Sequence, residues 1–191
     1  MSNLNKIKLI YDNLKDSCEV KENTIDGQTA KIIEIAYKIS QVIKSGGKIW
    51  VFGNGGSAAD SQHFAAELTG RFQNERRPLP AIALNCNSSE MSAIGNDYGF
   101  EETFSRPINA CSQKGDLAIG ITTSGNSENV IRAINKAKEK GLFTCVLTGG
   151  TGGKIKGLPD YEIIVKSKST PRIQETHEFI LHSIAELVEM D

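Results

Sequence analysis

The chain has 191 residues, 39% of them hydrophobic and 24% charged, which is the balance of a globular protein of one domain with at most an added arm. Its formal net charge of −1 provides no basic field, so neither nucleic acid nor a membrane surface is expected as a partner. No apolar run approaches the ~20 residues that span a bilayer, and the charged N-terminus lacks the apolar core of a signal peptide. We therefore expect a cytoplasmic protein whose four cysteines are reduced.

Residues 1–45 are predicted to form a helical arm. Ile7, Ile10 and Leu14 recur at helical spacing, and the same periodicity returns over 32–43. Between these stretches, the segment KENTIDG (21–27) predicts a break. Such an arm either packs against another subunit or covers the sheet as a helix pair, and the pattern leaves both possibilities open.

From Lys48 onward, short apolar runs alternate with helical stretches. The runs at 48–53, 80–84, 116–121, 143–149 and 161–165 predict buried parallel strands. Helices are predicted at 57–70, 88–94, 127–140 and 171–189, with a weaker one near 152–157. This order predicts βαβ units and a parallel sheet covered on both faces. Ligands of such sheets bind beyond the carboxyl ends of the strands, so the loops after Phe52, Leu84, Ile121 and Leu147 are the candidate sites.

Two of these loops are suited to holding an anion. GNGGSAAD (53–60) leads from a strand into a helix, with Ser57 as the expected N-cap and Asp60 three residues on. TTSGNSEN (122–129) places four hydroxyls at another helix start, which suits a phosphate monoester, although a hydroxyl-rich turn has the same composition. Neither loop matches a P-loop or GxGxxG, since Ala58 stands at the third glycine position. The pattern favours a small phosphorylated ligand over NAD or ATP.

The candidate chemistry lies on two helices. His63 and Glu67 are four residues apart and share a helical face, as metal ligands or as an ordinary surface pair. On the last helix Gln174 and His182 lie about 80° apart with a rise of roughly 12 Å, while His177 points elsewhere. Glu67 and His182 form a candidate acid/base pair for a proton transfer of the kind that interconverts ketose and aldose through an enediol. A metal could act instead of this pair or beside it.

Several motifs together resemble one family. FGNGGSAAD, HFAAELTGRF, GNDYGFEETFSR, GDLAIGITTSGNSENVI and RIQETHEFILH are similar to segments of the phosphoheptose isomerases, which belong to the sugar isomerase (SIS) domain superfamily. The resemblance covers about residues 45–190. It implies isomerisation of sedoheptulose 7-phosphate to D-glycero-D-manno-heptose 7-phosphate, the first step of ADP- or GDP-heptose biosynthesis, which feeds lipopolysaccharide or capsule.

The resemblance also implies an architecture. We expect an α/β fold, a three-layer Rossmann-like (flavodoxin-like) SIS domain over 46–191 with a five-stranded parallel sheet. The N-terminal helical arm, 1–45, is expected at a subunit interface. A homotetramer with active sites built between subunits is implied as well.

The site residues follow from the same resemblance. The expected acid/base pair is Glu67 and His182, and Arg71 is expected to reach a neighbouring site. Because Glu67 and His182 would have to serve both as ligands and as proton carriers, the division of their roles stays open. Zinc, one ion per subunit, is implied at His63, Glu67, Gln174 and His182. Substrate binding is implied for Asn54, Gly55, Gly56, Ser57, Glu67, Arg71, Asn96, Asp97, Thr122, Thr123, Ser124, Ser127 and Gln174.

Two alternatives remain at this point. Some tetrameric SIS relatives bind a partner such as a replication initiator, share the FGNGGSAA loop and need no catalytic pair. The other alternative is an isomerase of a different sugar phosphate, such as an arabinose or hexulose phosphate. The presence of His63, Glu67, Gln174 and His182 together argues against the binding protein.

Overall fold

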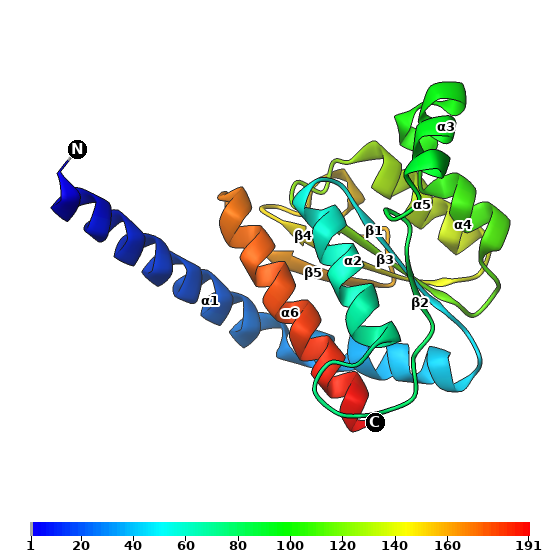
Figure 1. The fold of residues 1–191 in the computed structure, drawn as a ribbon, viewed down its shortest axis with the longest axis horizontal. Helices are drawn as coiled ribbons and strands as arrows, with labels where there is room; N and C mark the ends of the chain where they lie inside the picture. Colours follow the sequence, from blue (N-terminus) through cyan, green and yellow to red (C-terminus); the bar gives the residue numbers. More distant parts are fainter. Residues whose placement is uncertain (1) are drawn as a thin grey trace.

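A computed structural model describes residues 2–191 as an α/β fold built on one five-stranded parallel sheet (Figure 1). The strand order is β2-β1-β3-β4-β5, the flavodoxin-like order, as expected. The strands are β1 (Ile49–Gly53), β2 (Ala81–Ala83), β3 (Leu117–Thr122), β4 (Phe143–Gly149) and β5 (Tyr161–Val165). The α-helices are α1 (Asn3–Lys44), α2 (Gly56–Thr69), α3 (Ser88–Tyr98), α4 (Ser105–Cys111), α5 (Glu128–Glu139) and α6 (Thr170–Met190).

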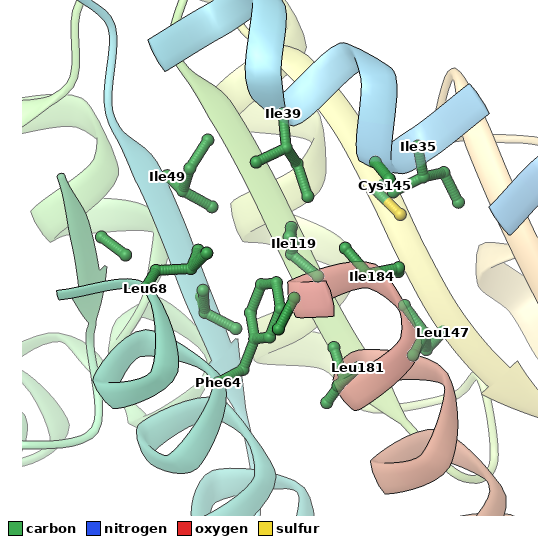
Figure 2. Packing of buried hydrophobic residues seen from close by; sticks show 14 of the residues in the cluster. Ile35, Ile39, Ile49, Phe64, Leu68, Ile119, Cys145, Leu147, Leu181 and Ile184 are labelled. Carbon is green, nitrogen blue, oxygen red and sulfur yellow. The ribbon is translucent and has the colours of Figure 1, made fainter. Parts of the chain in front are cut away.

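The sheet is covered on both faces because the residues of its strands alternate between two buried clusters. Ile49 and Val51 face the layer formed by α1, α2 and α6, whereas Trp50 and Phe52 face α4 and α5. Figure 2 shows the first layer, in which Ile39, Phe64 and Leu181 from its three helices meet over the sheet. The first of these clusters packs α2 and α6 next to each other on one face of the sheet, which positions the candidate site.

Helix α1 is continuous from Asn3 to Lys44, so the predicted break at 21–27 is wrong. A contact with a distant part of the chain stabilises the helix at segment 21–27. Such a contact cannot be recognised from the periodicity of the sequence. The Gln28 side chain donates to Ile164 O at 2.9 Å and accepts from Ile164 N at 3.0 Å, which pairs it with the outer edge of β5. The half of α1 beyond this point packs in the core. Before it, Asp16 and Ser17 still contact α6, and the N-terminal end of the helix extends away from the body of the molecule (Figure 1).

The remaining elements differ from expectation mainly in length. Helix α3 continues four residues past the predicted 88–94, ending at Tyr98. The weak helix near 152–157 is only a 3-10 turn, Gly153–Ile155, because Gly152, Gly153 and Gly157 adopt positive φ values that an α-helix does not accept. A second 3-10 turn, Phe100–Glu102, and the seven-residue helix α4 were not predicted, since neither is long enough to show helical periodicity.

The state of the cysteines and the apolar character of the helices were also predicted from the sequence. All four cysteines are free, as expected: Cys18, Cys86, Cys111 and Cys145. None of the helices formed within residues 2–191 has the length and apolar character needed to cross a membrane.

Candidate functional site

The loops after β1 and β3 meet at the carboxyl end of the sheet. These two strands are adjacent in the sheet, and the chain order reverses between them, which is the switch point where ligands of open α/β sheets bind. Asn54 and Asn129 join the two loops through side-chain hydrogen bonds, and Asn85 Nδ2 donates to Gly53 O at 2.7 Å. The loops predicted to hold an anion therefore form one connected surface.

A cavity of about 270 Å³ lies between these loops and the start of α6. Within it, the Thr122 and Ser127 hydroxyls are 3.0 Å apart, at the N-terminal end of α5. Hydroxyls and free backbone N–H groups at a helix start are suited to a phosphate oxyanion. The lining residues are Asn54, Gly56, Ser57, Ile121, Thr122, Thr123, Ser127, Thr170 and Gln174.

Two glycines shape this cavity. A Cβ on Gly56 would lie 1.8 Å from Gln174 Nε2, so only glycine lets the Gln174 amide rest against the first turn of α2. Gly125 has φ +67°, and its Cβ would lie 1.9 Å from Gly152 O, so the turn of the second loop also requires glycine.

Ser57 is not the N-cap that was predicted. Helix α2 begins at Gly56 with Gly55 as its cap, and Ser57 is a buried residue of the first turn.

Helices α2 and α6, whose first turns line this cavity, bring two histidines together farther along their lengths. His63 Nε2 lies 2.9 Å from Glu67 Oε1 and 3.2 Å from His182 Nε2. The Phe72 ring packs against His182, with centroids 5.3 Å apart. The predicted pairing of Glu67 and His63 on α2 with His182 on α6 is therefore present in the structure.

Glu178, which sequence reasoning did not single out, lies in the same cluster. Its Oε1 is 3.0 Å from His182 Nε2 and 3.2 Å from His63 Nδ1. Potential ligand atoms of His63, Glu178 and His182 all lie within 4.8 Å of one another. The signal was available in the sequence, because Glu178 stands four residues after Gln174 and four before His182 and so shares their helical face.

Asp60 adds a further carboxyl group next to this cluster. Burial is the largest cause that raises its pKa to about 7, followed by the negative charge of Glu178 and a hydrogen bond to it. Asp60 Oδ2 is buried with no donor beside it, so it shares a hydrogen bond with Glu178 only when one of the two carboxyls is protonated. Near neutral pH Asp60 therefore adds less than a full negative charge beside the two imidazoles.

This donor set fits a divalent metal ion. Two imidazoles with nearby carboxylates are the ligands that zinc and similar transition metals prefer, and the negative charge around them suits a cation. Among the predicted ligands, His63 Nε2 contacts both Glu67 Oε1 and His182 Nε2. The fourth, Gln174, lies against Gly56 in the loop cavity, two helical turns before His182.

The other predicted residues lie outside this centre in the single chain. Asn96 and Asp97 are exposed on α3 and line a separate hollow, where Asn96 Nδ2 donates to Asp97 Oδ1 at 2.8 Å. Arg71 is exposed after α2 and donates to Gln73 O at 3.2 Å. Gly55 and Ser124 belong to the two loops but do not line the cavity. A larger hollow of about 520 Å³ between α3 and α4 contains Asp97 but none of the loop hydroxyls.

His177 takes no part in the site, in agreement with its predicted direction. It is fully buried, and its Nε2 lies 3.1 Å from Thr148 O. Burial lowers its pKa to about 4, only partly opposed by this hydrogen bond, so the ring stays neutral and structural at ordinary pH. The histidines that remain candidates for the site are therefore His63 and His182.

The fold and the loop cavity at its switch point are those of a sugar isomerase (SIS) domain. The SIS domain family model matches residues 13–149. The chain is 51% identical to the phosphoheptose isomerase of Aquifex aeolicus over 186 residues. The aligned part covers 97% of this chain and 96% of the relative. The phosphoheptose isomerase of Aneurinibacillus thermoaerophilus is 50% identical over 94% of this chain and 92% of its own length. The chain belongs to the phosphoheptose isomerase family, and it is an isomerase.

Solved structures agree with this assignment. A phosphoheptose isomerase from Francisella tularensis superposes with a TM-score of 0.93 at 34% identity, covering all of both chains. The corresponding structure from Neisseria gonorrhoeae has a TM-score of 0.90 at 38% identity, over 96% of this chain and 98% of the other. These relatives do not favour the alternative of a binding protein without catalysis.

Proposed function

We propose that the chain interconverts sedoheptulose 7-phosphate and D-glycero-D-manno-heptose 7-phosphate through an enediol. The observation that carries the proposal is that α2 and α6 border both the loop cavity and the histidine–carboxylate cluster. A phosphate held by the first turn of α5 would leave the carbon chain of the sugar extending toward His63, Glu67 and His182. The family relatives support the same substrate pair.

The phosphate site is proposed at the second loop. Thr122 and Ser127 offer hydroxyls inside the cavity, and Thr123 and Ser124 complete the loop with further hydroxyls and backbone N–H groups. The sugar hydroxyls are assigned to the first loop and to Gln174, at residues Asn54, Gly55, Gly56 and Ser57, with Asn96, Asp97 and Arg71 as further substrate contacts.

The reaction requires two proton transfers. Conversion of the ketose removes a proton from C1 and returns it to C2. A second proton moves from the hydroxyl oxygen on C1 to the carbonyl oxygen on C2, so that C1 becomes the aldehyde carbon. Glu67, partly buried beside His63, and His182 are assigned these transfers, because a carboxylate and an imidazole can both accept and donate protons near neutral pH. The cavity holds the substrate while they act.

Zinc, one ion per subunit, is the proposed cofactor. His63, Glu67 and His182 would hold it, with Gln174 as the fourth residue that the family resemblance implies. When bound, the metal would polarise the carbonyl and hydroxyl oxygens as a Lewis acid.

The deciding experiment is turnover of sedoheptulose 7-phosphate by the purified protein, with arabinose and hexulose phosphates as comparison substrates. We expect selective turnover that is lost on chelation and restored by zinc. Turnover that persists in protein shown to be metal-free would support the isomerase but contradict the cofactor. Turnover of another sugar phosphate alone would contradict the proposed substrate.

Assembly is proposed to be a homotetramer in the cytoplasm, with active sites between subunits. The first half of α1 supports this, because its apolar stripe is exposed in the single chain, at Leu4, Ile7, Ile10, Tyr11 and Leu14. Arg71 and the hollow at Asn96 and Asp97 would then complete a neighbouring site. Light scattering of the Ile10→Glu variant tests this, since a charge in the stripe should dissociate the tetramer. The heptose product would enter lipopolysaccharide or capsule synthesis.

A further inference from the structure

We infer that Arg76 is a positioning residue for the proposed proton transfer, because its guanidinium group holds the turn of α2 that carries Glu67. The inference rests on the function proposed above, in which Glu67 moves a proton. Arg76 itself lies in the segment after α2 and does not line the loop cavity.

The C-terminal end of α2 needs hydrogen-bond donors from outside the helix. Backbone carbonyls in the last turn of a helix have no partner within that helix. The last turn of α2 contains no basic residue, and the chain leaves the helical path at Gly70, where φ is −86° and ψ is −112°. The carbonyl of Glu67, which stands in this last turn, is one of those that need such a partner.

The Arg76 guanidinium group supplies these donors. Its Nη2 donates to Glu67 O at 2.6 Å, and its Nη1 donates to Leu68 O at 2.9 Å and to Gly70 O at 3.2 Å. The helix dipole also favours a positive charge at a helix C-terminus. One side chain thus fixes the backbone of Glu67 together with the end of the helix.

Glu189 on α6 holds the Arg76 side chain in place. Arg76 Nε donates to Glu189 Oε1 at 3.1 Å, and the two side chains are only 14% and 0% exposed. The same Glu189 oxygen accepts from Phe72 N at 2.8 Å, and the Phe72 ring packs against His182. The ion pair therefore ties the turn that carries Glu67 to the helix that carries His182.

The location of these contacts separates the two ends of α2. A group that transfers a proton must lie within hydrogen-bond reach of it, and a displacement of about 1 Å can cost roughly 100-fold in rate. Glu67 stands in the last turn of α2, whereas Gly56 and Ser57 line the loop cavity from its first turn. Loss of the Arg76 contacts should therefore displace Glu67 and leave the cavity intact.

The test is steady-state isomerisation of sedoheptulose 7-phosphate by the full-length Arg76→Lys variant. Lysine keeps the charge, but its ammonium group does not reproduce the planar fork that contacts a carboxylate and several carbonyls at once. We expect kcat to fall at least about 10-fold while KM stays within about two-fold of the wild type. The matched control is Arg77→Lys, the same substitution at the neighbouring exposed arginine, which should keep the wild-type kcat.

A double variant identifies the residue through which Arg76 acts. In the Glu67→Gln background, Arg76→Lys should lower kcat by less than about two-fold, because the proton carrier that it positions is already absent. A merely structural role would lower kcat by the same factor in both backgrounds, and that result would contradict the inference.

The outcomes separate this inference from the function on which it rests. A wild-type protein that turns over no sugar phosphate, or a Glu67→Gln variant with the wild-type kcat, would overturn both. Wild-type turnover with an unchanged kcat in Arg76→Lys would overturn only the role of Arg76. A KM that rises as much as kcat falls would also overturn this role, because the cavity would then be disturbed together with Glu67.

A second variant keeps the inference testable if Arg76→Lys does not fold. Glu189→Asp retains the charge but withdraws the carboxylate from Arg76 and Phe72 by a methylene group. It should lower kcat in the same selective way, with little change in KM. An unchanged kcat in Glu189→Asp would contradict the inference.

Discussion

Asn54 and Asn129 exchange two side-chain hydrogen bonds, each from Nδ2 of one residue to Oδ1 of the other, with lengths of 2.8 and 2.9 Å. Asn129 is buried and also donates to Thr103 Oγ1 at 3.2 Å. The loop after β1 is thereby tied to the first turn of α5. The two halves of the cavity cannot move apart without leaving buried amide groups unpaired.

Replacing Asn129 with Asp should loosen the cavity. The substitution removes both amide donors and leaves Asn54 Oδ1 without its partner, so we expect the free energy of unfolding to fall by about 1–3 kcal/mol. The KM for the sugar phosphate should rise at least ~10-fold, because the phosphate loop loses its fixed geometry. Urea unfolding and steady-state kinetics measure the two effects. Asn109→Asp on the exposed face of α4 is the control, and equal KM values for the two variants would contradict the prediction.

Glu67→Gln should stop the reaction without disturbing the fold. The amide cannot act as a base, and general acid–base groups contribute about 10²- to 10⁴-fold to rates, so kcat should fall by at least that range. Circular dichroism should remain that of the wild type. Glu186→Gln, on an exposed position of α6, should retain full turnover. Wild-type kcat in the Glu67 variant would show that Glu67 does not carry a proton.

Glu189 should stabilise the loop after α2 in a pH-dependent way. Burial tends to raise its pKa, but backbone N–H groups of Asn74, Gln73 and Phe72 and the charge of Arg76 outweigh this and lower the pKa to about 2. A lowered folded-state pKa gives stability that is fully present above the unfolded value of 4.5 and is lost as pH falls through about 2. Glu189→Gln should therefore cost about 1–3 kcal/mol at pH 7.

That difference should shrink as the pH falls from 4.5 toward 2. Urea unfolding of wild type and Glu189→Gln across this range gives the measurement. A constant difference at all pH values would mean that the hydrogen-bonded shape of the side chain, and not its charge, holds the loop.

Two glycine substitutions should have opposite effects. Gly125→Ala forces a side chain into a positive φ and against Gly152 O, so it should cost more than about 2 kcal/mol and weaken phosphate binding. Gly27→Ala lies within α1, where a Cβ meets nothing within 4 Å, and should stabilise the protein by about 0.5–1 kcal/mol. The melting temperatures of both variants test this prediction. A Gly125→Ala variant more stable than the wild type would contradict the positive φ and the close contact with Gly152 O at this turn.

The core of the fold was predictable because strand and helix signals there are local. The run 143–149 matches β4 residue for residue, because a strand covered on both faces is rich in apolar residues on both of its sides. The course of α1 was not predictable, because its continuity depends on Gln28 meeting a strand 136 residues away in sequence. Helix α4 depends in the same way on contacts distant in sequence, because Phe104 and Ile108 are buried in a cluster with strand and α5 residues.

The candidate site was predictable where motifs lie directly beside strands or on one helical face. His63 and Glu67 share α2, and their meeting with His182 could be expected from the resemblance but not from spacing alone. Glu178 was missed although its position relative to His182 is visible in the sequence. The placement of Asn96, Asp97 and Arg71 toward a substrate remains a prediction, since it depends on surfaces that one chain does not complete.

The pairing of Gln28 with Ile164 has a consequence for solubility during folding and at high concentration. An exposed edge strand is a template on which another chain can add its own strand and begin aggregation. Here a side-chain amide occupies both backbone groups of Ile164 on the outer edge of β5. The opposite edge is formed by β2, which is only three residues long. A single glutamine on a helix thus protects the longer edge of the sheet against cross-β growth.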